Sequence, residues 1–275
     1  MPARPPAAQL HHELLDDWEL WLRAADASDN TVSTRITGVK LLWHVAGTPD
    51  PVSIPTTAVV RWLAGCNTKW TRCTYAASAR AWFRWLNDRG YRNDNPMVEL
   101  PVPKAPRSVP RPASTETVRS VLEVCGLRAR SYMTLATFLG LRVHEIAKIR
   151  GDDFDDEGWY YVRGKGGVFA AIPTHPLVEE LRKGYPRAGY WFPGKDDGHV
   201  QSSTVTSVIG RAFRKAGYPV TAHQLRHWYG THVQRVGKDA RATQTLLRHA
   251  NLASSQIYTL VADRHLQEIV RRLAV

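Results

Sequence analysis

The stretch Pro101-Val-Pro-Lys-Ala-Pro-Arg-Ser-Val-Pro-Arg-Pro112 divides the chain into two parts. Proline lacks a backbone N–H and fixes φ, so closely spaced prolines exclude helix and favour an extended, semi-rigid connector. Each flanking part has the length of one compact domain. We therefore predict a loose tail over residues 1–9, a first domain over 10–100, a linker over 101–112 and a second domain over 113–275.

The charge of the chain predicts a polyanionic partner. The formal net charge is +12 and the pI is about 9.9. Within residues 61–92 a single acid, Asp88, stands among seven basic residues. The seven are Arg61, Lys69, Arg72, Arg80, Arg84, Arg89 and Arg92. Because a solvated surface usually mixes both signs of charge, we interpret this segment as a candidate contact with nucleic acid.

The cysteines Cys66, Cys73 and Cys125 show no CxxC spacing, so they support neither a disulfide framework nor a zinc ribbon. Acidic residues follow the first positions in place of an apolar segment, and no run of about eighteen apolar residues occurs. We expect a cytoplasmic protein that is neither exported nor embedded in a membrane.

Apolar residues at helical spacing predict four helices in the first domain. The predicted spans are Leu10–Ala24, Thr31–His44, Pro55–Ala64 and Lys69–Arg89. In the last helix Asn67 is the expected N-cap. Its expected packed side consists of Trp70, Ala77, Ala81 and Trp85. Another face carries Lys69, Arg72, Arg80 and Arg84, and it either rests on DNA phosphates or is an ordinary solvated face.

The second domain reads as mainly helical with one small β-hairpin. Ser114 opens a helix with a capping signature, and a buried helix over Arg130–Leu139 ends at Gly140. Trp159–Arg163 and Val168–Pro173 are β-rich segments joined by glycines. Further helices are predicted over residues 143–150, 176–183, 201–216, 222–236 and 240–250. A last apolar stripe consists of Leu266, Ile269, Val270 and Leu273.

Several charged side chains of this domain are candidates for chemistry on a phosphate. Arg142 stands at the edge of a short helix, where Glu145 can brace its guanidinium. His223 and Arg226 share a helix face and can meet an anion together. Lys165 sits at the hairpin tip between glycines that permit close approach to DNA. Taken singly, each of these features is usually an ordinary surface group.

A metal site is the main competing interpretation of these residues. His223, His227 and His232 could suggest zinc, but no cysteine or carboxylate ligand stands at suitable spacing. The acidic run over residues 152–157 lacks the ligand spacing of a calcium loop. We therefore predict no metal.

His249 and Tyr258 complete the set near the end of the chain. A lone tyrosine is most often a packing residue. Here two arginines, a lysine and two histidines precede it, and a phenol with an ordinary pKa near 10 needs such cationic neighbours to act as a nucleophile.

The motifs together resemble the tyrosine recombinase (phage integrase) family, over the entire second domain. They are Gly140-Leu-Arg142-Val-His-Glu145-Ile, Gly164-Lys165-Gly166, His223-Gln-Leu-Arg226-His, Leu247-Arg-His249 and Ser255-Gln-Ile-Tyr258. Each motif alone is weak, but five in this order form a specific signal. The helical first half is similar to that family's core-binding domain, which together with the catalytic domain forms a clamp around DNA.

Family resemblance implies a role for each of these residues. Tyr258 attacks the scissile phosphate to form a 3′-phosphotyrosine, while Arg142 and Arg226 hold the phosphate. Lys165 is the general acid, His223 assists proton transfer, and His249 hydrogen-bonds the phosphate, with Glu145 as the supporting acid. The resemblance implies no metal and no cofactor.

Two departures from the family pattern stand out. Many relatives have Leu-Gly-His where this chain has Leu247-Arg248-His249, which adds charge beside the site. Where their hairpin continues with basic residues, this one has Val168-Phe-Ala-Ala, which weakens its contact with phosphate. The stretch before Leu10 leaves no room for an arm-binding domain, so the chain resembles compact Xer-like or small phage integrases.

The expected partners are double-stranded DNA attachment sites, a homotetramer on two duplexes and a possible directionality factor. The C-terminal apolar stripe either packs on its own domain or docks on a neighbouring protomer. Integration and excision of a phage or mobile element is the expected function. The alternatives are Xer-like dimer resolution, relaxation of DNA by a type IB topoisomerase-like enzyme, and a non-catalytic DNA-binding protein that retains the fold.

Overall fold

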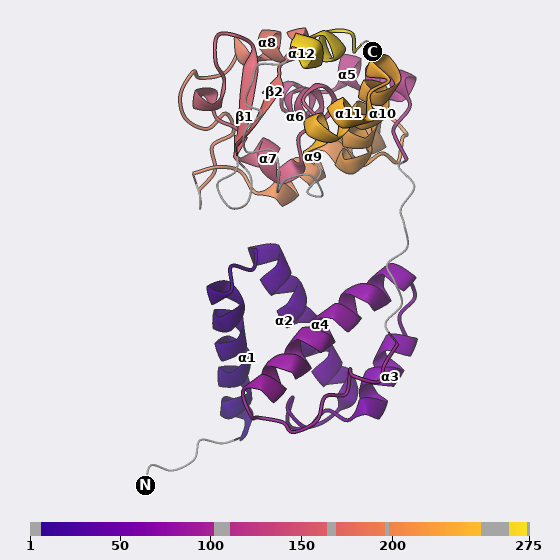
Figure 1. The fold of residues 1–275 in the computed structure, drawn as a ribbon. Helices are drawn as coiled ribbons and strands as arrows, with labels where there is room; N and C mark the ends of the chain where they lie inside the picture. Colours follow the sequence, from indigo (N-terminus) through magenta and orange to yellow (C-terminus); the bar gives the residue numbers. More distant parts are fainter. Residues whose placement is uncertain (1–6, 102–110, 164–168, 196–197, 249–263, 274–275) are drawn as a thin grey trace. The chain divides into compact units, whose positions relative to one another are not determined.

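The computed structural model describes residues 7–101, 111–163, 169–195, 198–248 and 264–273. The chain forms two compact units, Met1–Ser108 and Val109–Val275. Figure 1 shows both units. No helix within the described residues is both long enough and apolar enough to cross a membrane.

The first unit is helical throughout its regular structure. Its helices are α1 (Ala7–Ala24), α2 (Asp29–Ala46), α3 (Thr56–Ala64) and α4 (Lys69–Asp88). Ser28 caps α2, since its side chain accepts a hydrogen bond from the Thr31 N–H. Helix α4 packs mainly on α2, and the crossing is close: a Cβ added at Gly38 would lie 2.9 Å from both Cβ and Oγ of Ser78.

Helix α4 corrects two details of the prediction. Its N-cap is Thr68 rather than Asn67, because the Thr68 hydroxyl accepts the Thr71 N–H at 3.0 Å. Trp70 is 60% exposed and Ala77 is also exposed, whereas Trp85 is buried as expected. The packed side is Ala76, Ala79, Trp82, Phe83 and Leu86. Trp82 and Trp85 stack on each other and are both buried. The three- and four-residue spacing of apolar residues alone therefore did not identify the buried side of this helix.

The second unit surrounds one buried helix. Its elements are α5 (Thr115–Val124), α6 (Leu127–Phe138), α7 (Val143–Ala147), β1 (Trp159–Arg163), β2 (Phe169–Pro173), α8 (Pro176–Arg182), α9 (Ser202–Lys215), α10 (Ala222–Gly237), α11 (Ala240–Leu247) and α12 (Arg264–Arg271), with a 3-10 turn at Gly151–Asp153. Helix α6 packs against α8, α9 and α10 (Figure 1). Beyond its first turn it is buried on nearly every side, which is typical of a core helix.

The two strands form an antiparallel hairpin. Its register pairs Trp159 with Pro173 and Arg163 with Phe169. The predicted fold class, mainly helical with a small β-sheet, is confirmed.

Two helices of this unit end earlier than predicted. Helix α7 stops at Ala147, because the chain beyond it turns to pair with an extended segment, where Trp191 N–H donates to Ile149 O at 3.1 Å. Helix α11 stops at Leu247, because Arg248 adopts a left-handed backbone with φ of 52°.

The described part of the C-terminal apolar stripe packs on its own unit. Ile269, Val270 and Leu273 are buried in the same core as α6 and α10. The Leu273 carbonyl also lies 2.8 Å from His175 Nε2. In the single chain the stripe is therefore covered without a neighbouring protomer.

Gly38→Ala should destabilise the first unit. In an open helix interior this change gains about 1 kcal/mol of helix propensity, but here the new Cβ meets Ser78 at 2.9 Å. Overpacking of this kind costs about 1–3 kcal/mol. Urea unfolding measures the loss, and the double variant Gly38→Ala/Ser78→Gly should recover most of it. A more stable single variant would contradict the close crossing.

Candidate active site

One buried carboxylate gathers three guanidinium groups in the second unit. Glu145 lies in the first turn of α7, and its side chain is only 8% exposed. Its Oε1 accepts from Arg142 Nη1 at 3.1 Å, and its Oε2 accepts from the Arg142 backbone N–H at 2.6 Å. Arg248 Nη2 donates to the same Oε2, also at 2.6 Å. The Arg226 Nη1 atom lies 3.9 Å from Oε2. Segments far apart in sequence thus meet at one anion.

The charge balance of this cluster favours a further anion. Burial alone would raise the pKa of Glu145, but Arg248, the Arg142 N–H, Arg226 and the Arg142 guanidinium together hold it below its usual range. Three cations therefore face one carboxylate. A phosphate has the charge and the paired oxygens that such guanidinium groups bind best.

Arg226 is held by main-chain carbonyls. It lies in the first half of α10 and is 5% exposed. Its Nη1 donates to Gly140 O and its Nη2 to Leu247 O. Burial, together with the neighbouring Arg248 and Arg142, lowers the pKa of this guanidinium. An anion bound beside Arg226 would offset both the unfavourable burial of its charge and its repulsion by Arg248 and Arg142.

Gly140 is fixed in this site by its backbone and its surroundings. Its φ is +60°, and a Cβ built on it would lie 2.4 Å from the ring of Tyr229. Its carbonyl accepts hydrogen bonds from Arg226 and, at 3.2 Å, from Arg248. Only glycine combines this left-handed conformation with this close approach.

Two histidines stand on α10 beside Arg226. His223 is exposed, and its ring centroid lies 4.2 Å from that of His227 in an edge-to-face arrangement. His232 lies apart from this pair, because its Nδ1 is 2.9 Å from Trp228 O and its Nε2 is 3.1 Å from Thr115 Oγ1. The three histidines considered for zinc are thus divided between the surface and the core.

Comparison with known proteins identifies the family. The model of the phage integrase family matches residues 114–265. The chain belongs to that family. It is 36% identical over 203 residues to the tyrosine recombinase XerA of Pyrococcus furiosus, covering 69% of this chain and 68% of that one. It is 31% identical over 214 residues to XerC of Oceanobacillus iheyensis, covering 70% of each. The predicted family is confirmed, and this integrase is a DNA strand-transferring enzyme.

Solved structures extend the similarity to the first unit. The integrase of mycobacterium phage Brujita is 41% identical, with a TM-score of 0.58, and the match covers 95% of this chain and 92% of that one. A lambda integrase (75–356) dimer bound to a COC′ core site is 22% identical with a TM-score of 0.70, over 87% of this chain and 94% of that one. The second likeness shows the fold.

Half of the predicted catalytic set can be located in this integrase. Arg142 and Arg226 meet at Glu145, and His223 lies one turn before Arg226 on α10. The other three, Lys165, His249 and Tyr258, lie outside the described residues. The residue that the prediction did not place in the cluster is Arg248. Its signal in the sequence was a charged residue directly before His249 in the Leu247-Arg248-His249 motif.

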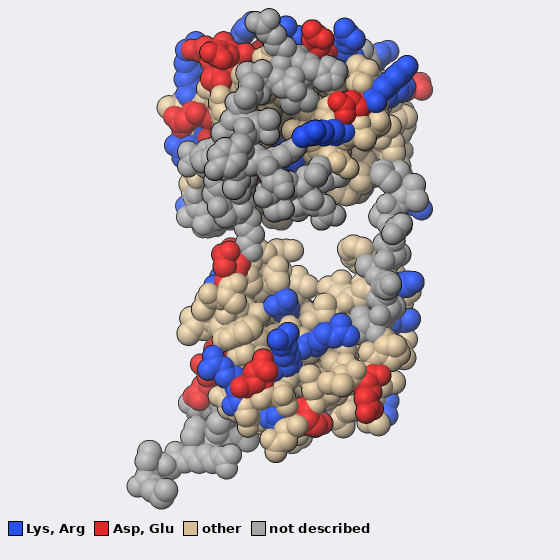
Figure 2. All heavy atoms as spheres, in the orientation of Figure 1, with Lys and Arg blue, Asp and Glu red and all other residues tan. Residues whose placement is uncertain are grey.

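The predicted DNA-binding residues of α4 divide into two kinds. Lys69 and Arg80 are exposed, and Arg84 is exposed with an ion pair of 3.6 Å to Asp88. Arg72 instead donates to Leu63 O at 2.9 Å and to Cys66 O at 3.3 Å, so its guanidinium closes the end of α3. Figure 2 shows Lys and Arg side chains gathered on the drawn face of this unit, with acidic side chains among them.

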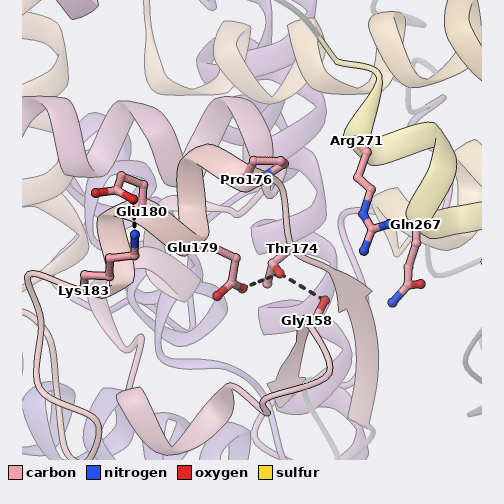
Figure 3. Close-up of a pocket in the computed structure, with 8 residues that line it drawn as sticks. All are labelled: Gly158, Thr174, Pro176, Glu179, Glu180, Lys183, Gln267 and Arg271. Carbon is pink, nitrogen blue, oxygen red and sulfur yellow. Dashed lines mark hydrogen bonds and ion pairs between the residues drawn. The ribbon is translucent and has the colours of Figure 1, made fainter.

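A surface pocket of the second unit lies away from the arginine cluster. Figure 3 shows its lining, in which Thr174 Oγ1 donates to Gly158 O and Glu179 also contacts Thr174. Gln267 and Arg271 of α12 form its other side (Figure 3). None of the described catalytic candidates, Arg142, His223 and Arg226, lines this pocket.

Gly140→Ala should disrupt both the fold and the site. The new methyl group meets the Tyr229 ring and strains a left-handed backbone, which together should cost about 3 kcal/mol or more. Gly90→Ala is the matched control, since Gly90 has φ of +73° with no atom within 4 Å of its added Cβ. That control should lose about 1 kcal/mol. Equal losses in thermal unfolding would show that the Tyr229 contact is unimportant.

Glu145→Gln should reveal the charge balance through pH. Because the folded-state pKa of Glu145 lies below its unfolded value, its carboxylate stabilises the fold above the unfolded pKa and loses this effect as pH falls through the folded pKa. The variant should lose about 3 kcal/mol at pH 7 and progressively less toward pH 3. Unfolding free energies of both proteins across this range measure the difference. A loss independent of pH would contradict the electrostatic explanation.

Proposed function

We propose that this integrase integrates and excises a phage or mobile element by cutting and rejoining DNA at attachment sites. The observation that carries the proposal is the meeting of Arg142 and Arg226 at a buried Glu145 in a member of the phage integrase family. The 41% identity to a phage integrase over nearly the whole chain favours an element's integrase over a housekeeping enzyme.

Each group has one role in the proposed reaction. Tyr258 Oη attacks the scissile phosphorus, the bond to the 5′ oxygen breaks, and a 3′-phosphotyrosine remains. Lys165 gives a proton to the departing 5′ oxygen, and His223 assists removal of the phenol proton. Arg142 and Arg226 hold the non-bridging oxygens and the transition-state charge, while His249 hydrogen-bonds the phosphate. The 5′ hydroxyl of a second strand then reverses these steps.

The assembly follows from the same proposal. Residues 10–100 would hold DNA through Lys69, Arg80 and Arg84, residues 101–112 would connect, and residues 113–275 would carry the chemistry. One lambda integrase structure is a tetramer bound to a Holliday junction, and we propose a homotetramer on two duplexes for this chain. A directionality factor and a cytoplasmic location belong to the same proposal.

The Xer relatives support a second candidate. Identities of 36% and 31% to XerA and XerC fit resolution of chromosome or plasmid dimers. Relaxation of DNA as by a type IB topoisomerase remains the third.

A suicide substrate tests the proposal. DNA nicked near a candidate attachment site should trap wild-type protein as a covalent adduct, because the freed 5′ fragment diffuses away before rejoining. Tyr258→Phe should give no adduct, and Tyr218→Phe, which alters an exposed tyrosine outside the predicted catalytic set, should retain it. Adduct formation by Tyr258→Phe would overturn the mechanism. Adducts on a dimer-resolution site alone would favour the second candidate, and relaxation of plasmid lacking any site would favour the third.

A further inference from the structure

Arg248 occupies a position that is costly for an arginine. It follows the last residue of α11 with φ of 52° and ψ of 48°, a left-handed conformation that favours glycine. Its side chain is only 9% exposed. Its Nε is buried without a hydrogen-bond partner among the described residues. Buried arginines are rare unless they are paired, so a specific interaction must offset these costs.

The offsetting interaction is with Glu145. Arg248 Nη2 lies 2.6 Å from Glu145 Oε2, which is within the range of a short charge-assisted hydrogen bond. The same guanidinium donates to Gly140 O at 3.2 Å and to Leu246 O at 3.3 Å. Glu145 and Arg248, about one hundred positions apart in sequence, are thus joined by a hydrogen bond within the arginine cluster.

The distances show which guanidinium each carboxylate oxygen serves. Oε1 takes Arg142, and Oε2 takes Arg248 together with the Arg142 N–H. Arg226 stays 3.9 Å from Oε2, too far for a hydrogen bond, and donates to neutral carbonyls instead. Arg248 therefore hydrogen-bonds to the Glu145 oxygen that lies nearest to Arg226.

We propose that Arg248 is a positioning residue of the strand-transfer reaction: it occupies Glu145, so that Arg226 keeps its charge for the scissile phosphate. This inference rests on the proposed function. Glu145 accepts hydrogen bonds from the side chains of Arg142 and Arg248, and Arg226 makes none with it.

Arg248→Gly tests the proposal with little backbone strain, since glycine suits φ of 52°. The matched control is Lys238→Gly, because Lys238 ends α10 with the same φ and the same charge but is exposed. At saturating protein, the single-turnover rate of adduct formation should fall about 30-fold for Arg248→Gly. This is less than the roughly 100- to 1,000-fold loss on removal of an oxyanion-hole donor itself, because Arg248 acts through Glu145. DNA affinity by gel shift should change less than about threefold. Lys238→Gly should match wild type in rate.

A double-mutant cycle tests whether Arg248 acts on the reaction through Glu145 or only holds α11 in place. If Arg248 acts through Glu145, then Arg248→Gly should add no further loss of rate in a Glu145→Gln background. Arg248→Lys should recover part of the rate, because an ammonium still reaches the carboxylate but lacks the fork of donors. Wild-type rates in Arg248→Gly, or full loss again in the Glu145→Gln background, would overturn the proposal.

A measurement without DNA keeps this inference separate from the proposed function. In protein with ¹³C-labelled glutamate carboxyls, assigned with Glu145→Gln, the Glu145 pKa should rise in Arg248→Gly and stay unchanged in Lys238→Gly. An unchanged pKa in Arg248→Gly would refute the pairing. Absence of adduct with wild-type protein, alongside a raised pKa, would instead refute the proposed function and leave the pairing in place.

Discussion

The second unit depends on the burial of Glu145 among Arg142, Arg226 and Arg248. A carboxylate removed from water is unfavourable by itself, and so is each buried guanidinium. Together they are compatible because their charges partly cancel and because Gly140 and Leu247 supply carbonyl acceptors. The cluster joins α7, α10 and the end of α11. The ion pairs that form the site therefore also hold these helices together.

The incomplete cancellation is what links structure to chemistry. Phosphoryl transfer places negative charge on oxygens around phosphorus, and preorganised cations stabilise that charge without reorganising. A site with fully paired arginines would have little to offer such a transition state. Here the excess positive charge is maintained inside the protein by packing, at the expense of the stability that an apolar core would provide.

Much of the architecture followed from the sequence because local signals were strong. The apolar periods predicted the helices of both units, and the glycines beside Lys165 predicted the hairpin. The motifs around Arg142, Lys165, Arg226, His249 and Tyr258 identified the family because all five stood in order. Where prediction failed, a non-local cause decided the outcome. The buried side of α4 depends on its packing against α2, which its own residue spacing does not specify.

Arg248 shows the same limit inside the site. Its charge was visible in the sequence, but its partner lies across the domain and its burial depends on a left-handed turn. No spacing rule connects positions 145 and 248.

The main-chain anchoring of Arg226 has a consequence for anyone who would redirect this enzyme to new target sequences. Its two acceptors are main-chain carbonyls, so the side chains at positions 140 and 247 do not supply these hydrogen bonds. Under the proposed function, combinatorial libraries can therefore vary the exposed faces of α4, while Gly140 and the Tyr229 ring beside it stay constant. Evolvability of recognition and rigidity of catalysis would then belong to different stretches of the polypeptide.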